Sequence, residues 1–94
     1  MTISSAGDRI AVDGAMTLPT ATSLLNEGNA LIAGGLDLVD LSAVTDVDSS
    51  GLAVVFGWLR AAKAQGKAIR VANPPKDFIS LAEVYGVADQ LPLA

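Results

Sequence analysis

The stretch Asp46-Val47-Asp48-Ser49-Ser50 groups the side chains whose types could do chemistry. Asp46 and Asp48 place two carboxylates two residues apart, which could suit a metal ion or an acid/base pair. No further ligand stands nearby in the sequence, so a structural or capping role is favoured for both carboxylates. The hydroxyls of Ser49 and Ser50 could instead accept a phosphoryl group. Serine modification is therefore the chemistry that stays open here.

The residue types that are missing exclude much of enzyme chemistry. The 94 residues contain no Cys and no His. Without Cys there is no thiol nucleophile, no disulfide framework and no Cys-ligated zinc site. Without His the commonest general base and the commonest transition-metal ligand are missing. We therefore predict a chain that is not an enzyme and that uses no cofactor and no metal.

Charge and apolar content favour a protein partner over nucleic acid or a bilayer. The net charge is −4, and the bases gathered between residues 60 and 77 have no aromatic side chain among them. Such a stretch makes a weak nucleic-acid surface. No apolar run approaches the ~20 residues of a membrane span, and residues 1–5 lack the features of a signal peptide. With 51% hydrophobic residues on so small a chain, we predict a cytoplasmic domain with a partner-binding surface.

Periodicity and turn residues predict one α/β domain over residues 1–94. The expected strands lie at Ile3, 9–13, 36–41 and 68–72, and the expected helices at 17–33, 49–65 and 75–85. The second strand should stop at Gly14, and an acidic loop should lead from the third strand into the second helix. The alternation of strands and helices predicts parallel pairing with right-handed crossovers, with the helices packed on the sheet.

The helix expected over 49–65 has two apolar faces. At 100° per residue, the residues that should face the sheet are Leu52, Val55, Leu59 and Ala62. The opposite face should carry Ala53, Val54, Gly57, Ala61 and Ala64, with Arg60 as its one charge. An ordinary exposed face would be richer in Lys, Glu and Gln. We hypothesise that a partner docks here; the alternative is that alanines are merely good helix formers. Trp58 should lie at the edge between the faces, as a core-edge anchor.

The start of this helix combines capping and anion-binding features. Asp48, Ser49 and Ser50 stand where N-cap residues belong, and their oxygens can accept from free backbone N–H groups. A phosphate there would be favoured by the same donors and by the helix dipole, but repelled by the nearby aspartates. A structural cap and a phosphorylation switch both remain open.

The segment Val39-Asp40-Leu41-Ser42 together with Val47-Asp48-Ser49-Ser50-Gly51-Leu52 resembles the motif of STAS domains. That resemblance implies the STAS fold: an α/β domain with a mixed, mostly parallel four-stranded sheet in the order β-β-α-β-α-β-α. In the anti-sigma factor antagonist branch, the matching second serine, Ser50, is the residue that the partner kinase phosphorylates. Ser49 is a second candidate hydroxyl.

The segments 51–55, 59–66 and 80–92 resemble more closely the MlaB-like branch, the small cytoplasmic STAS subunits of Mla-type phospholipid-transport ABC complexes. The resemblance implies binding to the ATPase subunit, support of its assembly and activity, and a location peripheral to the inner membrane through the complex. The residues expected in the contact are Asp48, Ser49, Ser50, Gly51, Ala53, Val54, Gly57 and Arg60. The alternative partner is an anti-sigma factor kinase, with Ser50 as the switch.

Overall fold

Four strands form one mixed sheet in the computed structural model, which describes residues 3–94. The strands lie across the sheet in the order β1 (Ile3–Ala6), β2 (Arg9–Met16), β3 (Leu38–Val47) and β4 (Arg70–Ala72). β1 pairs antiparallel with β2, whereas β2 with β3 and β3 with β4 pair in parallel. The mixed, mostly parallel sheet expected from the sequence is confirmed.

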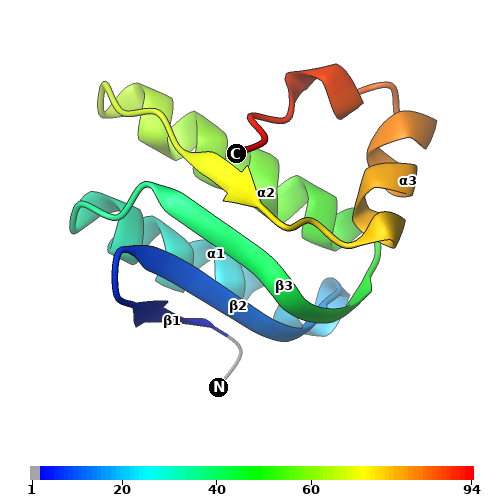
Figure 1. Cartoon of the computed structure of the whole chain (residues 1–94), viewed down its shortest axis with the longest axis horizontal. Helices are drawn as coiled ribbons and strands as arrows, with labels where there is room; N and C mark the ends of the chain where they lie inside the picture. Colours follow the sequence, from blue (N-terminus) through cyan, green and yellow to red (C-terminus); the bar gives the residue numbers. More distant parts are fainter. Residues whose placement is uncertain (1–2) are drawn as a thin grey trace.

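Two long helices cover one face of this sheet. α1 (Leu18–Ala33) connects β2 to β3, and α2 (Ser49–Ala64) connects β3 to β4. Both helices lie behind the strands in Figure 1, side by side and in contact with one another. α3 (Lys76–Val84) packs against α2 and β3, and a 3-10 turn (Ala88–Gln90) leads into the C-terminal tail. Both parallel crossovers therefore carry their helices to the same face, which leaves the other face of the sheet uncovered (Figure 1).

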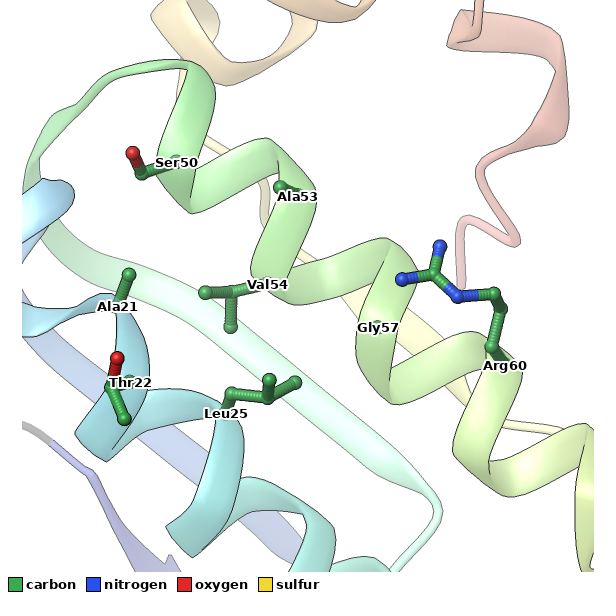
Figure 2. Close-up of a pocket in the computed structure, with 8 residues that line it drawn as sticks. All are labelled: Ala21, Thr22, Leu25, Ser50, Ala53, Val54, Gly57 and Arg60. Atoms are coloured by element: carbon green, nitrogen blue, oxygen red, sulfur yellow. The ribbon is translucent and has the colours of Figure 1, made fainter.

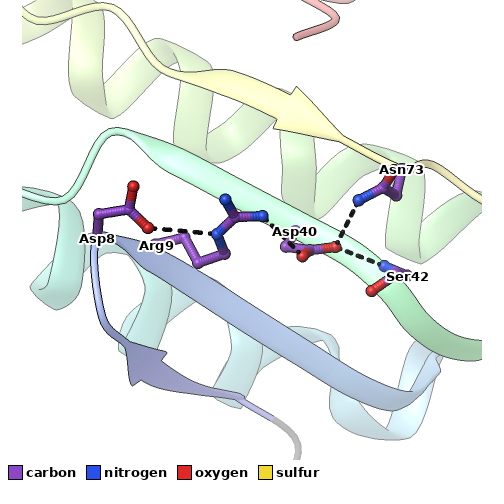
Figure 3. A network of polar contacts seen from close by, with 5 residues as sticks. All are labelled: Asp8, Arg9, Asp40, Ser42 and Asn73. Carbon is purple, nitrogen blue, oxygen red and sulfur yellow. Dashed lines mark hydrogen bonds and ion pairs between the residues drawn. The ribbon is translucent and has the colours of Figure 1, made fainter.

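The alternation of side chains along the two central strands separates the core from that open face. Ile10 and Val12 on β2 and Val39 and Leu41 on β3 are buried against the helices. Their neighbours point to the open face, where the Asp40 carboxylate forms a polar network (Figure 3).

The Asp40 network holds a charged carboxylate in place. Asp40 accepts from the backbone N–H of Ser42 at 2.9 Å and from the Asn73 amide at 3.3 Å, and it pairs with the Arg9 guanidinium at 3.1 Å. These hydrogen bonds, led by the one from the Ser42 backbone, lower the pKa of Asp40 to about 2. Arg9 also pairs with Asp8 at 3.3 Å. The network ties β2, β3 and the segment after β4 together on the open face.

Two strands run further than the sequence predicts. β2 continues past Gly14 to Met16, with a positive φ at Gly14 and a register shift beside it. β3 continues to Val47, so the acidic stretch expected as a loop is mostly strand. Both expectations were wrong for the same reason. A β-bulge accommodates the irregularity at Gly14. Pairing of Met16 with Val47 beyond the bulge then keeps both β2 and β3 in the sheet.

Candidate partner-binding site at the start of α2

Asp48 joins the starts of two helices. Its Oδ1 accepts from the backbone N–H groups of Ser50 at 2.8 Å and Gly51 at 3.4 Å, as an N-cap of α2. Its Oδ2 accepts from the backbone N–H of Leu18, the first residue of α1, at 3.2 Å. The capping role expected for Asp48 is confirmed, and this one carboxylate faces the positive ends of both helix dipoles. Asp46 is exposed, and no group of three or more acidic side chains in residues 3–94 is placed to hold a metal ion.

The two serines that follow Asp48 face different hollows. Ser50 is half-buried and lines a groove of about 300 Å³ between α1 and α2, with Leu25 and Val54 at its floor (Figure 2). Ser49 is exposed and lines a hollow of about 190 Å³ between α2 and α3, beside Tyr85. Ala53 lines both hollows and is itself exposed. The first turns of α2 therefore form a ridge of small side chains with a hollow on either side.

The placement expected for the outer face of α2 is correct only in part. Ala53, Ala64 and Arg60 are exposed, whereas Gly51 and Val54 are buried, Val54 with 4% of its surface exposed. Val54 is buried because α1 lies along this side of α2 and covers it. Gly51 and Val54 therefore do not belong to the exposed face, and Gly51 instead allows α2 to approach the backbone at Met16.

Gly57 and Trp58 also serve the contact between α1 and α2. A Cβ on Gly57 would lie 2.7 Å from Cδ1 of Leu25, so the glycine is explained by the close approach of α1. Trp58 is fully buried rather than at the core edge, and its indole N–H donates to the backbone carbonyls of Leu24 at 3.1 Å and Leu25 at 3.2 Å. The expected edge position of Trp58 was wrong because a second helix packs over it.

Three apolar side chains near this site are exposed although the sequence did not predict it. Leu18, Val84 and Tyr85 have 72%, 79% and 58% of their surface exposed. Tyr85 follows the buried Phe78 by seven residues, so helical periodicity places both on one face. The helix ends at Val84, however, and Tyr85, which caps it, is exposed. The Gly86 stop in the sequence was the one available indication of this helix end.

A family model described as a Mlab STAS domain matches residues 1–93. The chain belongs to this STAS family. Family members are binding proteins without catalysis, in agreement with the expectation drawn from the missing Cys and His. The resemblance to the MlaB-like branch is thereby confirmed.

Known proteins and structures agree with this assignment. The intermembrane phospholipid transport system binding protein MlaB of Haemophilus influenzae is 34% identical over 50 residues, which are 53% of this chain and 48% of that protein. The match thus spans about half the length of this curated relative. Unphosphorylated anti-sigma factor antagonist SpoIIAA superposes with a TM-score of 0.71 at 16% identity, over 98% of this chain and 85% of that one. A candidate anti-sigma factor antagonist of Thermotoga maritima gives 0.74 at 14% identity, over 97% and 82% of the two chains.

These structural likenesses confirm the STAS fold. None of the helices in residues 3–94 is long and apolar enough to cross a membrane.

Proposed function

We propose that this STAS chain is a binding subunit of an Mla-type phospholipid-transport ABC complex and that it docks on the ATPase subunit. The docking ridge consists of Ser49, Ser50, Ala53, Gly57 and Arg60 on the outer side of α2. The observation that carries the proposal is the exposed Ala53 between two hollows, in a chain of the Mlab STAS family. Such a subunit would lie in the cytoplasm, at the inner membrane only through the complex.

The ridge has the shape that a close protein contact needs. Ala53 is small and exposed between the two hollows, so a partner backbone can approach α2 closely at this residue. Larger partner side chains then have room in the groove over Leu25 and Val54. Arg60 stands at the far end of that groove and offers a cation to the partner (Figure 2). Asp48 supports the ridge from its end by fixing the first turn of α2.

The test compares two substitutions of one kind on the same helix. Ala53→Arg places a long charged side chain on the ridge, whereas Ala64→Arg places it 11 residues further along, at another exposed position. Binding of the purified chain to the purified ATPase subunit of an Mla-type complex from the same organism is measured by calorimetry, and ATPase turnover is followed in parallel. Ala53→Arg should weaken binding at least about 100-fold, because a central residue of an interface is blocked. Ala64→Arg should bind like the wild type.

Two results would refute this proposal: no binding of the wild-type chain to the ATPase subunit, or unchanged binding of Ala53→Arg. Gly57→Arg is less suited to the test because its side chain would strike Leu25 and disturb the contact of α1 with α2.

A phosphorylation switch of the antagonist type is the second candidate function. Two hydroxyls stand in the first turn of α2, and that of Ser49 is exposed. A phosphate on Ser50 would bring negative charge beside the Asp48 carboxylate and into the groove along α1. Incubation with an anti-sigma factor kinase and ATP, followed by mass spectrometry of the wild type, Ser49→Ala and Ser50→Ala, tests this candidate. Loss of the phosphopeptide in Ser50→Ala alone would support it, and an unmodified wild type would refute it.

A further inference from the structure

Two of the large apolar side chains that the core leaves exposed, Val84 and Tyr85, follow one another at the end of α3. Val47 lines a hollow of about 310 Å³ together with Val84, and Tyr85 lines the hollow that holds Ser49. We name Val47, Val84 and Tyr85 the apolar edge. It borders the docking ridge at Ser49, which lines the same hollow as Tyr85, and extends away from it onto α3. Figure 1 shows α3 beside the start of α2.

Exposed large apolar side chains are otherwise rare on this chain. Within residues 3–94 the remaining ones are Leu18 at the start of α1 and Leu93 in the C-terminal tail, with 72% and 52% of their surface exposed. Concentration of such side chains at one edge is typical of a surface that a partner covers.

The charges around the apolar edge have mostly one sign. In the segments that carry the edge, residues 46–48 and 76–85, the acids are Asp46, Asp48, Asp77 and Glu83, and the one base is Lys76. Asp77 lines the same hollow as Val84, and Glu83 is exposed on the last turn of α3. The ion pairs found in the described part of the chain are those of Arg9 with Asp8 and Asp40, so Asp77 and Glu83 have no cation paired with them. The matching surface of a partner is therefore basic.

We propose that the docking surface continues from the ridge across the apolar edge, where the partner contributes a basic amphipathic segment. Its apolar side chains cover Val84 and Tyr85, and its Lys or Arg side chains meet Asp77 and Glu83. This inference rests on the proposed docking to the ATPase subunit and names the chemistry of the partner's contact.

Two pairs of variants test the two halves of the proposal in the binding assay with the ATPase subunit. Tyr85→Ala removes an exposed aromatic anchor and should weaken binding about tenfold or more. Leu93→Ala removes an exposed apolar side chain outside the edge and should leave binding unchanged. Asp77→Lys with Glu83→Lys should lower the association rate about tenfold or more at low salt, with a smaller difference at high salt. The control for this charge reversal is Glu27→Lys with Asp37→Lys, which reverses two exposed acids on α1 and before β3. It should leave the association rate unchanged.

The outcomes separate this inference from the proposed function. If Ala53→Arg loses binding while Tyr85→Ala and the double lysine variant bind like the wild type, the partner stops at the ridge and the inference is overturned. If Tyr85→Ala weakens binding but the charge reversal does not, the partner segment is apolar and not basic, which overturns the second half. If the wild type does not bind the ATPase subunit, the proposed function falls and the inference with it. Equal thermal unfolding midpoints for all variants show that each change acts at the surface.

Discussion

Replacement of Gly51 by Ala should destabilise the chain, even though Ala is the better helix former. A Cβ at Gly51 would lie 2.9 Å from Cβ of Met16 and 2.9 Å from Cγ2 of Val47, and closer still to the carbonyl oxygen of Met16. Ordinary contacts of a Cβ begin at 3.4 Å. The obstacle is mainly backbone, and the same carbonyl accepts from the N–H of Asp48 at 3.3 Å. β2 therefore cannot withdraw without disturbing the start of α2.

The magnitude follows from two opposed effects. Gly→Ala in a helix interior gains about 1 kcal/mol. Insertion of a methyl group into a closed contact costs about 1–3 kcal/mol, with the upper part of the range expected against backbone. The net loss in the free energy of unfolding should be about 1–2 kcal/mol. In a domain of this size, such a loss lowers Tm by roughly 4–16 °C.

Gly57→Ala is the matched control, on the same helix and with the same added methyl group. Its close neighbour is Cδ1 of Leu25 at 2.7 Å, the end of a flexible side chain. Leu25 can move aside, so the helix-forming gain should offset the contact and stability should change by less than about 0.5 kcal/mol. Urea unfolding followed by the fluorescence of Trp58, the single tryptophan, measures both variants. Equal stability of Gly51→Ala and Gly57→Ala would refute the backbone-contact reasoning.

Three further changes test the polar contacts. Asp48→Ala should cost about 1–2 kcal/mol in urea unfolding because two helix starts lose an acceptor, whereas the exposed Asp46→Ala should cost almost nothing; equal losses would contradict the capping role. Because the pKa of Asp40 is lowered to about 2, its charged form stabilises the fold above about pH 4, and this contribution, up to about 2 kcal/mol, disappears as the pH falls towards 2. Asp40→Asn should therefore reduce the pH dependence of the urea unfolding midpoint between pH 5 and 2. An unchanged pH dependence would argue against the network. Lys67→Met should lower the free energy of unfolding by up to about 1 kcal/mol, because the Lys67 ammonium donates to the last carbonyls of α1. Replacement of the exposed Lys63 by Met should change stability little, and thermal unfolding scans measure both variants.

The order of elements and the face of each central strand could be predicted from local patterns. Apolar alternation at Ile10 and Val12, and again at Val39 and Leu41, identifies the core face of a strand without knowledge of its neighbours. The cap at Asp48 was likewise predictable, because the residue types of an N-cap act within three residues of the chain.

The surroundings of α2 could not be predicted in the same way. A helical wheel assumes one buried face, but α2 packs on both the sheet and α1, so Val54 and Trp58 are buried on a side that the wheel assigns to solvent or to the edge. That second contact depends on where α1 crosses in space. The exposure of Leu18 and Tyr85 depends similarly on the residues at which α1 begins and α3 ends, and such boundaries are set by tertiary pairing.

The carboxylate shared by α1 and α2 has a consequence for the motions of the chain. Each oxygen of Asp48 protects an amide of a different helix, that of Leu18 or that of Ser50. A rotation of this side chain frees both amides in one event, so their protons should exchange with solvent as one cooperative unit. Added charge at the serines would then loosen the first turn of α1 as well as that of α2. A change made at one end of the ridge would thus be detected as faster hydrogen exchange at Leu18, 30 residues before Asp48 in the chain.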